Sequence, residues 1–165
     1  MRFRTKVTAL VAGAIATAGI AAVAPLASAA VNDTAGEHCV LLADNGKVAC
    51  SDSEAQSTER LGAQGYVRGA KIWNYKNYSG SGSLTFLVPR ACSAGYDNEG
   101  WRFNWPSLSS WNNKASSVKT FNRCDIKLFD NENFGGADST WIDARADLSN
   151  VGGGWNNRAS SIRLS

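Results

Sequence analysis

The chain has 165 residues, 44% of them hydrophobic, with 17 Lys and Arg against 14 Asp and Glu. Three of the basic residues and none of the acidic ones lie in Met1–Ala30, so the rest of the chain has 14 of each and a formal net charge of zero. That balance, without a Lys/Arg cluster, excludes a phosphate-backbone partner, and we expect no nucleic acid. Roughly 135 residues remain after residue 30, which fits one domain with a real core.

Residues 1–30 have the pattern of a secretory signal peptide. The segment starts with basic residues, continues with an apolar run over 7–24 and ends in Ala27-Ser28-Ala29-Ala30. An uncleaved membrane anchor is the alternative, because the apolar run approaches the length that spans a bilayer. The Ala-x-Ala end favours cleavage. We therefore expect a secreted, extracellular protein without membrane attachment after cleavage.

Four cysteines in a secreted chain predict two disulfides. Strand-like runs flank Asp44-Asn45-Gly46, a turn sequence, so a hairpin would place Cys39 opposite Cys50. Cys92 and Cys124 then pair by exclusion, although sequence alone allows three connectivities. A zinc site is the rival interpretation, but the spacings lack Cys-x-x-Cys and the chain has one histidine.

A short helix is predicted after this hairpin. Ser51-Asp52-Ser53-Glu54 has the spacing of a capping box, and Glu54–Leu61 can form about two turns before Gly62. Hairpin and helix make up an accessory segment of residues 31–70.

Residues 71–165 contain an internal duplication. Trp111-Asn112-Asn113-Lys114-Ala115-Ser116-Ser117-Val118 is matched by Trp155-Asn156-Asn157-Arg158-Ala159-Ser160-Ser161-Ile162. Each phrase follows an opening of the form aromatic-x4-aromatic-x-Gly, at Trp73–Gly80 and Phe129–Gly136. Two repeats, at about 71–121 and 126–165, take priority in predicting the fold. Short apolar runs among many glycines and serines indicate an all-β structure.

Taken together, the opening and the closing Asn-Asn-x-x-Ser-Ser phrase resemble the βγ-crystallin Greek-key motif in its calcium-binding, microbial form. The resemblance implies a Greek-key β-sandwich built from two repeated motifs. It also implies up to two calcium ions, held by side-chain and main-chain oxygens. In each site the closing loop would be completed by the opening hairpin of the partner motif. The implied ligand positions are Asn74, Asn113, Lys114, Ser116, Asp130, Asn157, Arg158 and Ser160.

Two of these positions carry long cations. The resemblance gives Lys114 and Arg158 a role through their carbonyls, so we expect both side chains to point outward. The site that uses Asp130 should be tighter than the one that uses Asn74, because a carboxylate balances a dication. The alternative is that Asn and Ser only hold the loops through side-chain-to-backbone bonds.

Catalysis is not expected. The single histidine, His38, sits beside Cys39 in the accessory segment, away from the repeats. The acidic residues are scattered over turns, without a pair that would face another across a cleft.

Three functions fit these expectations: a secreted calcium-binding protein with a structural or interaction role, a peptidase inhibitor, and a toxin-like or cell-surface module. The chain also resembles small secreted bacterial metalloproteinase inhibitors, in its signal peptide, two disulfides and single domain. The first repeat has 12 extra residues between Gly80 and Trp111, and an insertion between strands predicts a loop. If this loop inhibits a peptidase, the partner would be an extracellular protease, and we expect the inhibitor to be a monomer. The alternative is that the loop is only a solvated crossover between strands. The candidate inhibitory loop contains Arg90, Ala91, Cys92, Ser93 and Tyr96.

Overall fold

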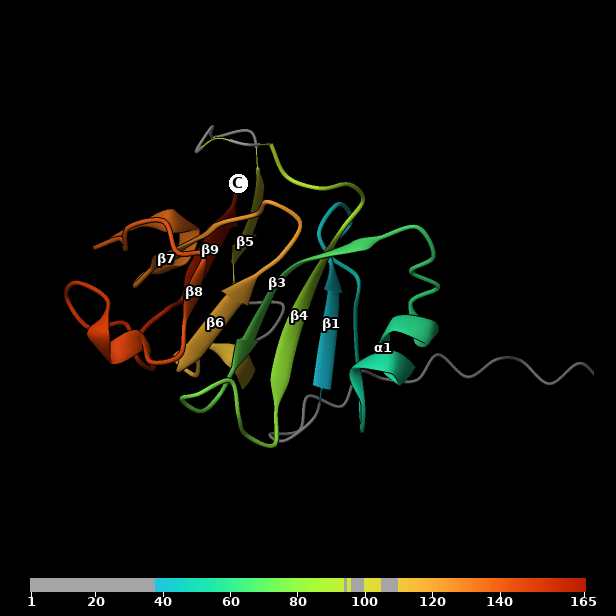
Figure 1. The fold of residues 1–165 in the computed structure, drawn as a ribbon, viewed down its shortest axis with the longest axis horizontal. Coiled ribbons are helices and arrows are strands. Elements are labelled where there is room, and N and C mark those ends of the chain that lie inside the picture. Colours follow the sequence, from blue (N-terminus) through green and yellow to red (C-terminus); the bar gives the residue numbers. More distant parts are fainter. Residues whose placement is uncertain (1–37, 94, 96–99, 105–109) are drawn as a thin grey trace, which may run out of the picture.

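The computed structural model describes residues 38–93, 95, 100–104 and 110–165, so the predicted signal peptide lies outside the described residues. The chain forms two sheets and one short α-helix (Figure 1). None of the helices in the described ranges is long and apolar enough to cross a bilayer. In chain order the elements are β1 (His38–Leu42), β2 (Val48–Ser51), α1 (Glu54–Arg60), β3 (Val67–Trp73), β4 (Ser83–Val88), β5 (Trp101–Asn104), β6 (Ser117–Thr120), β7 (Ile126–Phe129), η2 (Glu132–Phe134), β8 (Ala144–Arg145), η3 (Leu148–Asn150) and β9 (Ser161–Leu164).

The two repeats exchange strands between the sheets. The larger sheet has the order β2-β1-β4-β3-β6-β8 and the smaller one β5-β9-β7. The first repeat therefore sends β5 to pair with β9, and the second sends β8 to pair with β6. The segment after β7 makes isolated bridges at Asp138 and Ile142. This crossing confirms the predicted all-β Greek-key sandwich.

The core lies between the sheets and follows the strand alternation. Val118 and Ile162 are fully buried, whereas Lys119 is exposed and Arg163 half-buried at the neighbouring positions. Both sheets contribute fully buried side chains, among them Ile72, Leu84, Phe86, Ile126, Leu128 and Leu164.

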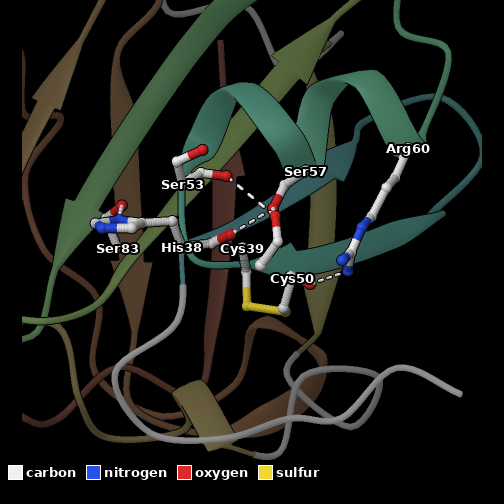
Figure 2. Close-up of a disulfide and its surroundings, with 8 residues drawn as sticks. His38, Cys39, Cys50, Ser53, Ser57, Arg60 and Ser83 are labelled. Carbon is white, nitrogen blue, oxygen red and sulfur yellow. Dashed lines mark hydrogen bonds between the residues drawn. A yellow bond between two sulfur atoms is a disulfide. The ribbon is translucent and has the colours of Figure 1, made fainter. Parts of the chain in front are cut away.

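The N-terminal hairpin extends the larger sheet. β1 runs antiparallel to β2 with Cys39 opposite Cys50, and the two form the predicted disulfide (Figure 2). On its other edge β1 pairs in parallel with β4. The hairpin thus covers the edge of β4 and continues its hydrogen-bond ladder.

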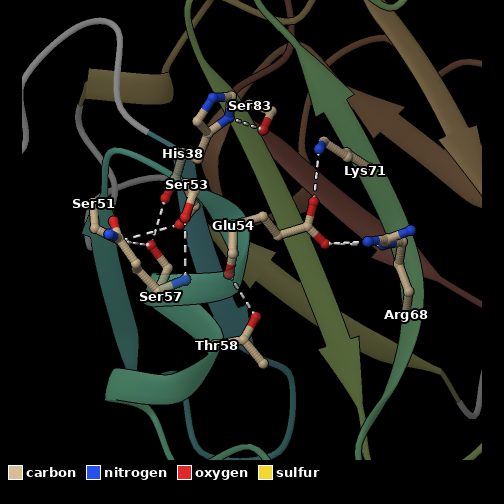
Figure 3. A network of polar contacts seen from close by, with 10 residues as sticks. His38, Ser51, Ser53, Glu54, Ser57, Thr58, Arg68, Lys71 and Ser83 are labelled. Carbon is tan, nitrogen blue, oxygen red and sulfur yellow. Dashed lines mark hydrogen bonds and ion pairs between the residues drawn. The ribbon is translucent and has the colours of Figure 1, made fainter.

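The predicted helix forms, but its cap is different. Ser53, and not Ser51, is the N-cap, and its hydroxyl accepts a hydrogen bond from the N–H of Gln56. Ser51 instead bonds the buried Ser57 hydroxyl at 2.6 Å, which ties the helix to β2. Glu54 bridges from the helix to Arg68 and Lys71 of β3 (Figure 3). Burial opposes ionisation of Glu54, but its bonds to Lys71 and Arg68 outweigh burial and lower its pKa.

The second disulfide joins Cys92 to Cys124, as predicted by exclusion. The backbone N–H of Cys92 also bonds the carbonyl of Asn122 at 3.0 Å. The start of the surplus segment is therefore held against the residues that lead into β7.

Candidate metal centre

The two closing loops bond to each other reciprocally. The N–H of Asn113 donates to the carbonyl of Ala159 at 3.0 Å, and that of Asn157 donates to the carbonyl of Ala115 at 2.8 Å. Both asparagines are left-handed, with φ of 56° and 55°, a conformation that Asn tolerates better than most residues. The second Asn of each phrase therefore makes the turn that joins the repeats.

Each closing loop is also bound to the opening hairpin of its own repeat. The N–H of Ser116 donates to the carbonyl of Trp73 at 2.9 Å, and that of Ser160 to Phe129 at 2.8 Å. The hairpin and the serine of a site thus come from one repeat, and the asparagine crosses from the other. This corrects the expectation that the partner motif supplies the hairpin. The next serines repeat the pattern: Ser117 binds Tyr75 O and Tyr78 N, and Ser161 binds Asn131 O and Phe134 N.

The glycine of each opening makes room for the residue after the first aromatic. Gly80 and Gly136 have φ of 116° and 75°, in the region that favours glycine. A Cβ atom at Gly80 would lie 2.2 Å from Oδ1 of Asn74, and one at Gly136 would lie 1.9 Å from Oδ1 of Asp130. The glycine therefore lets this polar side chain fold back over the hairpin.

The first site brings several oxygens together around one hydroxyl group. The Ser116 hydroxyl lies 3.0 Å from the carbonyl oxygen of Asn74 and 3.1 Å from Oδ1 of Asn157. One hydroxyl proton cannot serve both acceptors fully. Among the described residues, Oδ1 of Asn74 and of Asn156 is buried without a hydrogen-bond partner. These four residues line an open pocket of about 450 Å³, which we call the Asn74 site. Lys76 lines it too, with its ammonium paired to Asp147 at 2.9 Å.

The second site, which we call the Asp130 site, has an internal counter-ion. Oδ2 of Asp130 accepts a hydrogen bond from Nη2 of Arg158 at 2.8 Å. This bond lowers the pKa of Asp130. Oδ1 of Asp130 and of Asn112 is buried without a partner in the described part of the chain. The side chain of Arg158 thus turns onto Asp130, contrary to the expected outward orientation.

The structure brings five of the eight predicted ligand positions together, in two groups. Asn74, Ser116 and Asn157 meet in the Asn74 site, and Asp130 and Arg158 meet in the Asp130 site. Ser160 is buried beside the hairpin of its own repeat, Asn113 is exposed at the turn, and Lys114 is half-buried. Sequence reasoning missed Asn112 and Asn156. Their repetition at the first Asn of both phrases was the available signal.

The donor chemistry at the Asn74 site suits a hard cation. Its oxygens are amide, hydroxyl and main-chain carbonyl oxygens, which calcium accepts. Groups of three or more His, Cys, Asp or Glu suited to a metal do not occur among the described residues. A soft or thiolate-bound metal therefore has no ligand set in this part of the chain.

His38 contacts a serine hydroxyl that is buried. Its Nδ1 lies 2.8 Å from the hydroxyl of Ser83 (Figure 3). Ser83 is fully buried, so its hydroxyl cannot reach a substrate.

The candidate inhibitory loop is described only at its start. Arg90 and Ser93 are exposed, Ala91 is half-buried and Cys92 is buried, whereas Tyr96 lies outside the described residues. Protease inhibition, a protease partner and the monomeric state stay predictions.

The duplicated hairpins, the joined closing loops and the exchanged strands define a βγ-crystallin-type fold. Neither the protein-family models nor the curated proteins gave a match to this sequence. Among solved structures, similarity covers 58% of this chain and 92% of a βγ-crystallin domain from Flavobacterium johnsoniae, with 24% identity and a TM-score of 0.40. It covers 58% of this chain and 95% of a βγ-crystallin domain from Clostridium beijerinckii, with 17% identity and a TM-score of 0.42. The N-terminal domain of protein S is similar at 21% identity, 59% and 94% coverage and a TM-score of 0.42.

Proposed function

We propose that this protein is a secreted calcium-binding protein with a structural role, and that the ion binds at the Asn74 site. The observation that carries the proposal is the group of oxygens around the Ser116 hydroxyl, which lies 3.0 Å from Asn74 O and 3.1 Å from Asn157 Oδ1. A cation there would accept lone pairs that a single hydroxyl proton cannot satisfy. The predicted signal peptide and the two disulfides support an extracellular location.

The charge of the site sets the expected affinity. Asn74, Ser116, Asn156 and Asn157 are all neutral, so no protein carboxylate among them balances the dication. Calcium affinity rises with ligand charge and site rigidity, and extracellular modules bind with Kd of about 10⁻⁴–10⁻³ M. We expect the Asn74 site in that range. Water would complete the six to eight oxygens that calcium takes.

Calcium would reinforce contacts that already join the repeats. Asn74 and Ser116 belong to the first repeat and Asn157 to the second. An ion between them would add a bond across the two repeats and stabilise only the native state. Its role would then be mechanical and thermal stability outside the cell.

Calorimetric titration of the chain without residues 1–30 tests the proposal, with magnesium as the control because it dehydrates reluctantly. At free calcium tenfold above Kd, the native state gains about 1.4 kcal/mol. That gain raises Tm by about 5 °C for a domain of this size. No heat of binding and an equal Tm in excess calcium and in chelator would contradict the proposal.

A further inference from the structure

We infer that Arg158 acts as a built-in cation at the Asp130 site, so that the protein binds one calcium ion and not two. This inference rests on the proposed calcium function of the Asn74 site. It concerns which of two homologous sites remains open to an external ion.

Oxygen atoms surround the guanidinium of Arg158 on several sides. Nη2 donates to Oδ2 of Asp130 at 2.8 Å, and Nη1 donates to the carbonyl of Gly153 at 2.9 Å, with that of Gly154 at 3.4 Å. Cζ lies 4.7 Å from the centre of the Trp155 ring. A carboxylate and main-chain carbonyls are also the ligands that calcium prefers. The guanidinium thus uses oxygens of the type that a metal would use, and its planar fork fits them.

The backbone of the second repeat is adapted to this arginine. Gly153 and Gly154 have φ of +84° and +68°, which turns their carbonyls toward the Arg158 side chain. Ser109 and Ser110 stand at the corresponding positions before Trp111 in the first repeat. Residues other than Gly enter the left-handed region at a steric cost. The two repeats therefore differ in sequence at the positions whose carbonyls accept from Arg158 in the second repeat.

The charges of the two repeats differ in a matched way. In the second repeat Asp130 and Arg158 form an ion pair, whereas the first repeat has neutral Asn74 with Lys114 at the position of Arg158. Lys114 makes no ion pair within the described ranges. An ammonium also lacks the bidentate fork of Arg. The Asp130 carboxylate and the Arg158 guanidinium thus occur in the same repeat, where each balances the charge of the other.

The consequence is a reversed order of affinity. Calcium at the Asp130 site would have to displace Arg158 from Asp130 or share space with a positive charge, and both lower its affinity. At the Asn74 site the nearest cation, Lys76, pairs with Asp147 at 2.9 Å and not with a candidate ligand. The carboxylate that would favour calcium is thus already paired with Arg158. This ion pair stabilises the second repeat without a metal ion.

Stoichiometry by calorimetry tests the inference. The wild type should bind one ion and Arg158→Gln two, because glutamine removes the charge that competes at Asp130. Lys114→Gln is the matched control at the equivalent position and should still bind one. In chelator, Arg158→Gln should have a lower Tm than the wild type. Adding calcium should raise the Tm of Arg158→Gln by more than it raises the Tm of the wild type.

The alternative outcomes separate the inference from the function on which it rests. Two ions in the wild type, or one ion in both wild type and Arg158→Gln, would overturn the role of Arg158 and leave calcium binding intact. No binding by the wild type and the variant would contradict the calcium function itself. If Arg158→Gln does not fold, serine variants decide: Ser116→Ala should abolish binding and Ser160→Ala should not change it. Loss of an ion in Ser160→Ala would overturn the inference.

Discussion

The hydroxyl oxygen of Ser116 lies 3.1 Å from Oδ1 of Asn157, which is 41 positions later in the chain and belongs to the other repeat. The same hydroxyl is 3.0 Å from the carbonyl of Asn74 in its own repeat. One site is therefore assembled from both copies of the duplication. A single copy of the phrase holds only part of this group of oxygens.

Adding charge to the Asn74 site should tighten it. Asn157→Asp keeps the shape of the side chain and adds a carboxylate beside Ser116, so we expect calcium affinity to rise about tenfold. Asn113→Asp, at the equivalent turn of the other loop, is the control and should change the affinity much less. Calorimetric titration measures both. Equal affinities for wild type and Asn157→Asp would place the ion away from Asn157.

The glycine of the second opening should tolerate no side chain. Gly136→Ala forces a left-handed alanine whose Cβ would lie 1.9 Å from Asp130 Oδ1, and we expect a loss of about 3 kcal/mol. Gly46→Ala is the matched control, since Gly46 has a φ of +70° with open space around it. That variant should cost about 1 kcal/mol. Urea unfolding that gives equal losses would show that Asp130 moves away freely.

The two disulfides should contribute unequally. Cys92–Cys124 closes a loop of 32 positions and Cys39–Cys50 one of 11. Chain entropy predicts losses of about 4 and about 3 kcal/mol when each pair is replaced by serine. Urea unfolding of the two double variants checks the order. A larger loss from the Cys39 and Cys50 pair would mean that native contacts of the hairpin outweigh the loop length.

Acid should weaken the pair between Asp130 and Arg158. The bond to Arg158 lowers the folded-state pKa of Asp130, so its contribution to stability is full above the ordinary value of about 3.9. It is lost as pH falls through the lower folded-state value. In chelator between pH 6 and 2, the Tm advantage of the wild type over Arg158→Gln should shrink. Parallel curves for the two proteins would show that the pair does not affect stability.

Much of the fold could be predicted because repetition and turn chemistry are local signals. The Trp-Asn-Asn phrases identified the repeats, and the Asp44-Asn45-Gly46 turn gave the pairing of Cys39 with Cys50. The resemblance implied a Greek-key sandwich, but not that β5 and β8 are the strands exchanged, since strand partners depend on packing between distant segments. The N-cap at Ser53 was missed because Ser51 had the better spacing, while its hydroxyl bonds Ser57 in the structure.

The candidate site could be predicted only in its residue types. The sequence placed Asn and Ser in two loops, and the resemblance assigned each loop to the hairpin of the partner motif, whereas the serines bond the hairpin of their own repeat. The direction of Arg158 depends on the carbonyls of Gly153 and Gly154, which become acceptors only through their positive φ. Charge counting by sequence therefore favoured the Asp130 site, and the geometry favours the Asn74 site.

A crystal structure of the protein in millimolar calcium would show directly whether the ion binds at the Asn74 site. We expect a calcium ion bonded to Asn74 O, Ser116 Oγ and Asn157 Oδ1 at about 2.3–2.6 Å, with water completing the shell. Arg158 should remain on Asp130. A calcium-soaked crystal in which the Asn74 site holds only water would show that calcium does not bind there.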